Sequence, residues 1–147
     1  MPNGVPAKRV RLVLDTNTVV SGLLWDNTPS QLIDAGLQGS IELFTSQALL
    51  LELEDVLPRR KLARRVAASG LSVAQLVARY ALLAQNVSPA TIERVSADPD
   101  DDHVLACALA AQADLIVSGD SDLLNLKSYQ GMPIVSPAEA LKRLPQR

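Results

Sequence analysis

Acidic residues at the ends of apolar segments are the side chains of this 147-residue chain best suited to chemistry. Asp15 directly follows the apolar run 10–14, and Asp120 follows the run 114–118. Asp101 lies in the acidic run 98–102, which leads into a stretch rich in alanine and leucine. Carboxylates that crowd together repel one another unless a cation compensates them. Hard oxygen ligands favour Mg²⁺ or Mn²⁺ over zinc, and such a metal can activate water for attack on a phosphodiester.

Each acid also has a purely structural interpretation. Strand-end aspartates often cap turns or helices, and for Asp15 alone that interpretation is as good as the functional one. Glu52 taken alone is a solvated residue beside the apolar stripe of its helix, and most members of 98–102 must be loop and cap residues. We expect Asp15, Asp101 and Asp120 to converge at the C-terminal edge of a parallel sheet. This convergence favours a metal site, which Glu52 can join from its helix.

Composition predicts one compact domain in a reducing, cytoplasmic location. Hydrophobic residues make up 48% of the chain and its net charge is only -2, which suits a globular domain with a real core. The single cysteine, Cys107, lies in an apolar run and is expected to be a buried hydrophobe. No apolar stretch approaches the roughly 18 residues of a membrane span, so we expect no membrane partner.

Two residue types are too scarce to support whole classes of function. The single histidine, His103, excludes mechanisms that need two histidines and zinc sites built from several. Aromatic residues make up only 3% of the chain, which argues against a stacking platform for nucleic-acid bases. Any grip on nucleic acid must therefore be mostly ionic.

Strand and helix patterns alternate along the chain. Apolar, β-prone runs predict strands near 10–14, 41–44, 86–88, 114–118 and 133–135. Capping signals and helical spacing predict helices over 28–39, 46–57, 72–84, 98–112 and from 136 onward. This alternation predicts an α/β fold whose parallel sheet is covered on both faces and binds ligands beyond the C-terminal strand ends. Residues 1–8 are expected to be a flexible tail, and 9–147 a single domain.

Four segments resemble, in the right order, the successive motifs of PIN domains. They are residues 14–17, 49–53, 98–108 and 113–124, and the resemblance is closest to PIN proteins described as toxin components of prokaryotic toxin–antitoxin systems. It implies a three-layer α/β sandwich with a central, mainly parallel five-stranded sheet flanked by helices. It also implies metal-dependent endoribonuclease activity on RNA, a homodimer or higher homo-oligomer, and a cognate antitoxin protein as partner.

The resemblance also assigns roles to individual residues. Asp15, Glu52 and Asp101 match the three main acids of the family and Asp120 matches the fourth, which together would bind Mg²⁺ or Mn²⁺ and carry catalysis. Asp122 matches a further metal ligand at a variably acidic position. Asn17 and Ser118 match polar neighbours that hold the acids in place. Asp101 is chosen by its offset from Ala106 and Ala108, and the adjacent registers at Asp98, Asp100 and Asp102 stay open.

A cationic segment follows the helix that carries Glu52. Its five cations within seven residues are Arg59, Arg60, Lys61, Arg64 and Arg65. In a chain that is acidic overall, such a segment favours RNA binding through phosphates. A solvated connection between helices explains it about as well.

Two other functions account for part of this pattern. A haloacid-dehalogenase-like phosphatase fails because Asn17 stands where that chemistry needs an aspartate as general acid. A PIN-like module that only binds RNA or a protein is the remaining alternative, and the full set of four acids argues against it.

Overall fold

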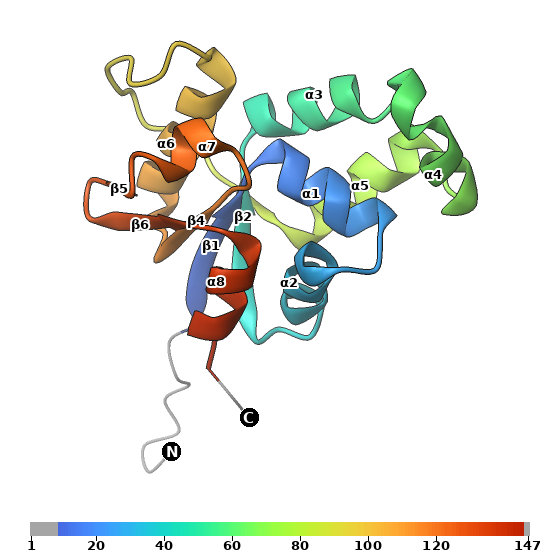
Figure 1. Cartoon of the computed structure of the whole chain (residues 1–147), viewed down its shortest axis with the longest axis horizontal. Helices are drawn as coiled ribbons and strands as arrows, with labels where there is room; N and C mark the ends of the chain where they lie inside the picture. Colours follow the sequence, from blue (N-terminus) through green and yellow to red (C-terminus); the bar gives the residue numbers. More distant parts are fainter. Residues whose placement is uncertain (1–8, 146–147) are drawn as a thin grey trace.

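The computed structural model describes residues 9–145 (Figure 1). The expected flexible tail, 1–8, lies outside the described residues. Five strands run parallel, namely β1 (Val10–Leu14), β2 (Ile41–Thr45), β3 (Gln85–Asn86), β4 (Leu115–Val117) and β6 (Met132–Val135). Their order across the sheet is β3-β2-β1-β4-β6. This arrangement confirms the predicted α/β fold with a mainly parallel sheet.

A sixth strand at the edge of the sheet was not anticipated. β5 (Ser128–Tyr129) pairs antiparallel with β6 through the two-residue turn Gln130-Gly131. Both turn residues have positive φ, at 50° and 80°, which is the conformation that a tight hairpin turn requires. Two-residue strands are too short for the alternation that sequence reading relies on.

Helices cover both faces of the sheet. They are α1 (Thr16–Leu24), α2 (Thr28–Leu37), α3 (Gln47–Val56), α4 (Ala63–Ala68), α5 (Val73–Leu83), α6 (Pro99–Ala111), α7 (Ser121–Leu124) and α8 (Pro137–Arg143), with a 3₁₀ turn η1 (Arg60–Leu62). Figure 1 shows α6 and α7 on one side of the strands and α1, α3 and α5 on the other. The described chain therefore forms three layers, as expected.

Alternation along β1 explains these layers. Leu12 and Leu14 pack into an apolar cluster with α1, α2, α3, α5 and α8, whereas Val13 packs into a second cluster with α6 and α7. Successive side chains of a strand point to opposite faces, so a strand covered on both faces must be apolar throughout. Cys107 is fully buried in the second cluster, as expected of a small hydrophobe.

The main corrections to the expected elements lie where a strand passes directly into a helix. The expected helices do not include residues 16–24, yet α1 begins at Thr16, directly after Asp15. β-branched residues at 16, 18, 19 and 20 disfavour a helix locally, but Val19, Val20 and Leu24 are buried against the core. Tertiary packing therefore overrides the local preference.

Several helix caps confirm the sequence signals and one shifts by a residue. Ser46, Ser72 and Ser136 cap α3, α5 and α8 as expected. Asn27, not Thr28, caps α2, and its capping box closes with Ser30. Two neighbouring cap-type residues can each start a helix, and local sequence does not decide between them.

No single helix in residues 9–145 is long and apolar enough to cross a membrane. The bent pair Arg60–Ala68 and Val73–Leu83, broken at 74°, meets the length and composition criteria only when the two are taken together.

Candidate functional site

An acidic cleft of about 290 Å³ opens at the C-terminal ends of β1 and β4. All four predicted acids, Asp15, Glu52, Asp101 and Asp120, line it. The rest of its lining is Thr16, Asn17, Val56, Arg59, Asp98, Asp100 and Val104. In a parallel sheet, residues that follow neighbouring strands meet at this rim, which is why positions 105 residues apart can lie together.

The Ser118 hydroxyl connects two of the acids. Asp15 is buried at the start of α1, where its Oδ1 accepts a hydrogen bond from the Thr18 N–H at 2.9 Å. Ser118, which is fully buried, donates from Oγ to Asp15 Oδ2 and accepts at Oγ from the Asp120 N–H at 2.9 Å. One side chain thereby orients the Asp15 carboxylate and fixes the backbone that carries Asp120.

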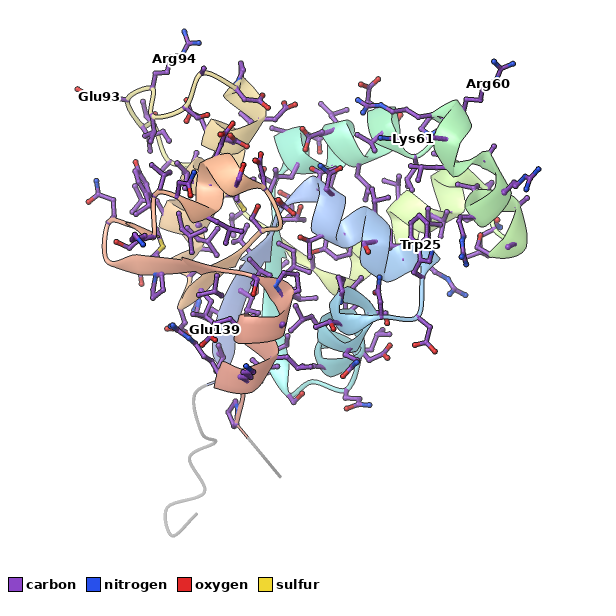
Figure 2. The ribbon with its side chains drawn as sticks, viewed as in Figure 1. Trp25, Arg60, Lys61, Glu93, Arg94 and Glu139 are labelled. Atoms are coloured by element: carbon purple, nitrogen blue, oxygen red, sulfur yellow. The ribbon has the colours of Figure 1, made fainter. Side chains whose placement is uncertain are left out.

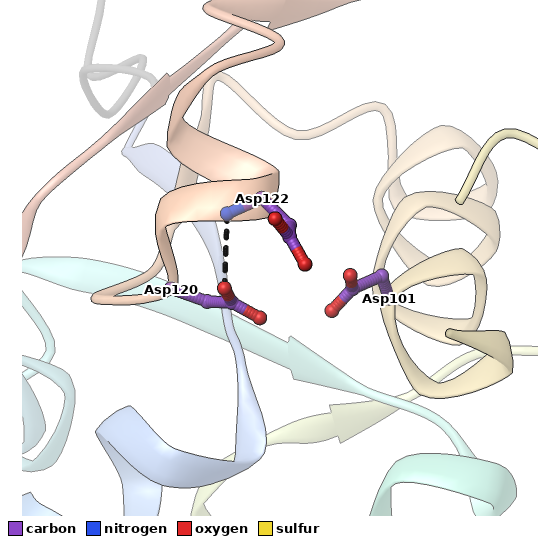
Figure 3. Close-up of side chains that lie close together, drawn as sticks. All are labelled: Asp101, Asp120 and Asp122. Carbon is purple, nitrogen blue, oxygen red and sulfur yellow. Dashed lines mark hydrogen bonds between the residues drawn. The ribbon is translucent and has the colours of Figure 1, made fainter. Parts of the chain in front are cut away.

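Three carboxylates approach one another across the cleft (Figure 3). Asp101, Asp120 and Asp122 each offer an oxygen, and these oxygens all lie within 4.8 Å of one another. Asp101 is buried on the first turn of α6, while Asp120 and Asp122 come from the start of α7. Asp120 Oδ1 also accepts from the Asp122 N–H at 2.9 Å, which ties the two residues together.

The acidic residues of the run 98–102 make different contacts. Asp98 caps α6 by accepting from the Asp100 N–H at 3.0 Å. Asp102 accepts hydrogen bonds from the N–H groups of Val95 and Ser96, the closest at 2.9 Å. Of the four registers, only Asp101 belongs to the three-carboxylate cluster.

Glu52 and Asp100, which both line the cleft, form a second acidic contact. Burial of Glu52 is the main reason that its pKa rises from 4.5 to about 7, and the nearby Asp100 carboxyl adds to the rise. Thr16 acts in the opposite direction and lowers the pKa. Sequence reasoning did not single out Asp100 as a neighbour of Glu52, because their proximity depends on how α3 packs beside α6.

Burial also raises the pKa of Asp101. The hydrogen bond from Ser96 Oγ to Asp101 Oδ2, at 2.9 Å, opposes this rise, and the charges of Asp120, Asp98 and Asp122 add to it. Ser96 was missed at the sequence level, since its loop carries no periodic pattern. The carboxylates of the cleft are therefore under mutual repulsion.

The donor set of the cleft fits a hard divalent cation. Its ligand atoms are carboxylate oxygens, which Mg²⁺ and Mn²⁺ prefer. The Thr16 hydroxyl, a further oxygen in the lining, is buried beside Glu52. A cation would relieve the repulsion between carboxylates that adds to the effect of burial on the pKa values of Glu52 and Asp101. Asp15, Glu52, Asp101, Asp120 and Asp122 are the residues that could hold it.

Asn17 and one residue of the cationic segment line the cleft, and the other cations lie outside it. Asn17 is exposed in the cleft lining, and no hydrogen bond within residues 9–145 joins it to the acids. Arg59 lines the cleft, whereas Figure 2 shows Arg60 pointing away from the body of the protein. The Arg65 guanidinium lies over the Trp25 ring, 5.0 Å from its centroid, so this cation is packed against the protein.

The rest of the cationic segment lies on helical turns beyond α3. Arg60 and Lys61 are on η1, and Arg64 and Arg65 are on α4. Among the described residues, none of these four lines the acidic cleft. The segment is therefore structured, and Arg59 is its member nearest to the candidate chemistry.

A comparison with protein-family models finds the PIN domain over residues 11–122, which covers more than half of the chain. The matched span begins in β1 and ends at Asp122, so it includes every acid in the cleft. No curated protein matches the chain significantly.

Proposed function

We propose, from the premise that the chain belongs to the PIN-domain family, that it is an Mg²⁺- or Mn²⁺-dependent endoribonuclease. Family membership by itself indicates a nuclease-type function. The single observation that supports the finer proposal is the convergence of Asp15, Glu52, Asp101 and Asp120 on one cleft with an all-oxygen donor set. The proposal makes these four acids catalytic and adds Asp122 as a further metal ligand.

The side chains of the cleft would have different roles in hydrolysis. Asp15, held by the Ser118 hydroxyl and the Thr18 N–H, presents a fixed carboxylate at the rim of the sheet. Asp101 presents a second carboxylate from α6 to the same space. A bound Mg²⁺ or Mn²⁺ would activate water and neutralise the charge that develops on the phosphate oxygens. His103, the only histidine of the chain, is not among the residues that line the cleft.

Arg59 is the cation best placed to bind the RNA backbone at the reacting phosphate. It is exposed, lines the cleft, and forms no ion pair within the described residues despite the surrounding carboxylates. A free guanidinium binds phosphate oxygens with two parallel hydrogen bonds. Arg60, Lys61 and Arg64 would add longer-range attraction for the strand.

The proposal extends to the biological context that the resemblance implies. The protein would act as the toxin of a toxin–antitoxin pair, as a homodimer or higher homo-oligomer, with a cognate antitoxin as partner. A small gene immediately adjacent to this one, whose product binds the protein and suppresses its nuclease activity, is the expected finding. An isolated gene and a protein that binds no neighbour's product would refute the toxin role and leave the nuclease proposal intact.

The nuclease proposal is tested by RNA cleavage with Mg²⁺ or Mn²⁺ in the parent protein, Asp15→Asn and Asp101→Asn. The parent should cleave single-stranded RNA, EDTA should abolish cleavage, and both variants should lose nearly all of it. Equal activity in all three proteins would show that the activity does not come from these acids. A folded parent that binds RNA without cleaving it would favour a non-catalytic PIN-like module.

A further inference from the structure

A second hollow, which we call the polar groove, adjoins the acidic cleft. It has a volume of about 500 Å³ and is lined by Asn17, Thr18, Ser21, Pro29, Gly119, Asp120, Ser121 and Pro137. Asn17 and Asp120 also line the acidic cleft, so the two hollows share a border. A chain molecule whose phosphate sits among the acids and which continues past this border must enter the polar groove.

The polar groove is built where four elements meet. Its lining comes from α1, the start of α2, the connection from β4 into the first residue of α7, and the start of α8. α1 and α2 cross closely because position 22 is glycine, where an added Cβ would lie 2.6 Å from Ile33 Cδ1 and 3.0 Å from the Pro29 backbone. α2 in turn packs against α8 (Figure 1). The walls of the groove are thus held by packed helices.

The chemistry of the polar groove differs from that of the acidic cleft. Its side-chain polar groups are hydroxyls and one amide, and its only charged member is Asp120 at the shared border. Asn17 and Ser121 are exposed and make no side-chain hydrogen bond within residues 9–145. Ser21 Oγ accepts from Asn27 Nδ2 at 2.8 Å and keeps its own hydrogen to donate.

Neutral donors and acceptors of this kind suit a sugar and a base edge better than a row of phosphates. A groove of several hundred Å³ is in the size range of small-ligand sites. It contains no aromatic side chain, so a base held there is recognised by hydrogen bonds to its edge and not by stacking. Base edges are free for such contacts only when the nucleotide is unpaired.

We infer that the polar groove binds one unpaired ribonucleotide next to the scissile phosphate, through hydrogen bonds to its sugar and base edge. This inference rests on the proposed function, because the acidic cleft fixes where the phosphate lies. Arg59, which lines the cleft but not the groove, binds the backbone at the reacting phosphate, and Asn17 and Ser121 bind the adjacent nucleotide.

Gly119 offers a way to fill the groove without disturbing the fold. An added Cβ there meets no heavy atom within 4 Å, and the residue does not have positive φ. Gly119→Leu should therefore fold normally and place an apolar side chain in the groove. Ser121→Leu, at an exposed position, is a second filling variant in case the first is unstable. Asn125→Leu is the matched control, since Asn125 is exposed at the end of the same helix and lines neither hollow.

The experiment measures kcat/KM with labelled single-stranded RNAs that are lengthened by one nucleotide at a time on either side of the mapped cleavage site. On one side, the nucleotide that enters the groove should raise kcat/KM of the parent about tenfold or more, as expected for two or three hydrogen bonds. Gly119→Leu should lose this gain, so that the ratio of kcat/KM between the lengthened and the shortest RNA falls toward one, and Asn125→Leu should keep the ratio of the parent. Filling variants that are folded and keep the full gain would overturn the inference.

A binding measurement separates failure of the inference from failure of the proposed function. Fluorescence anisotropy with a short single-stranded RNA and Mn²⁺ is read with and without Gly119→Leu, in proteins that also carry Asp101→Asn so that the RNA stays intact. RNA binding about tenfold weaker after Gly119→Leu supports the groove even if the parent cleaves no RNA. Unchanged binding, or a fully paired RNA that competes as well as the single strand, overturns the inference.

Discussion

Ser118→Ala is the substitution that most directly tests how the fold arranges the acids. The Ser118 hydroxyl is fully buried and is shared between Asp15 Oδ2 and the Asp120 N–H. Alanine keeps the backbone and removes only this oxygen. The Asp15 carboxylate loses a donor, and the Asp120 N–H loses its acceptor.

The expected loss of stability follows from these two hydrogen bonds. A hydrogen bond to a charged group contributes about 1.5–3 kcal/mol, and a neutral one contributes about 1 kcal/mol. Part of the second is recovered by water, because Asp120 is only half buried. We expect Ser118→Ala to lower the free energy of unfolding by about 2–3 kcal/mol, which corresponds to a Tm lower by about 4–12 °C for a chain of this size. Because partners that orient metal ligands matter to affinity, Mn²⁺ should bind about tenfold to hundredfold more weakly.

The assay is urea denaturation in EDTA for stability and calorimetric titration with Mn²⁺ for affinity. Ser128→Ala, at an exposed position in β5, is the control and should change neither quantity. If Ser118→Ala unfolds at the same urea concentration as the parent and binds Mn²⁺ equally well, the Ser118 hydroxyl does not organise the site.

Three further predictions test the electrostatics of the cleft. In EDTA, the raised pKa of Glu52, about 7 against 4.5, means that the folded protein retains a proton that the unfolded chain releases, so stability should fall as pH rises from about 4.5 to 7. Taken in full, this pKa shift amounts to about 3 kcal/mol of stability, but Glu52 is half exposed and solvent screening leaves on the order of 1 kcal/mol. In urea denaturation at several pH values, Glu52→Gln should remove this contribution to the dependence of the free energy of unfolding on pH. An unchanged pH dependence would contradict the raised pKa of Glu52. Arg59→Gln should lower kcat/KM for RNA by about tenfold to hundredfold, because it removes a charge-assisted contact. Arg60→Gln should lower kcat/KM by about threefold or less, with both variants measured at several salt concentrations. Equal losses would show that the two cations act alike. Mn²⁺ at a hundred times its Kd should stabilise the parent by about 2.7 kcal/mol, and the same Mn²⁺ concentration should stabilise Asp101→Asn far less. Thermal melts with and without EDTA measure both values. Equal stabilisation of the two proteins would place the metal elsewhere.

Local sequence signals predicted most of the fold because they act over a few residues. Caps at Ser46, Ser72 and Ser136 and the apolar runs of the strands needed no knowledge of the tertiary structure. α1 escaped prediction because burial of Val19 and Val20 outweighs their poor helix propensity. β5 and α7 are too short for periodicity to mark them.

Some residues of the candidate site could be predicted by physical reasoning from the sequence, and others only from the family resemblance. Asp15 and Asp120 follow apolar strands, and the rim of a parallel sheet brings such positions together, so physical reasoning placed them. Glu52 and the register of Asp101 depended on the family resemblance. The structure places Glu52 in the same cleft as the others and distinguishes Asp101 from its acidic neighbours by burial and by its contact with Asp120 and Asp122.

The sequence by itself determined the α/β class, the alternation of the main strands and helices, and an acid at the end of each of two central strands. These are consequences of side-chain periodicity and capping, which operate within a few residues. Only the tertiary structure decided that Ser118 bridges Asp15 and Asp120, that Asp100 lies beside Glu52, and that the polar groove borders the cleft. Each of these depends on how helices pack across the sheet, a sum of many weak contacts between residues far apart in the chain.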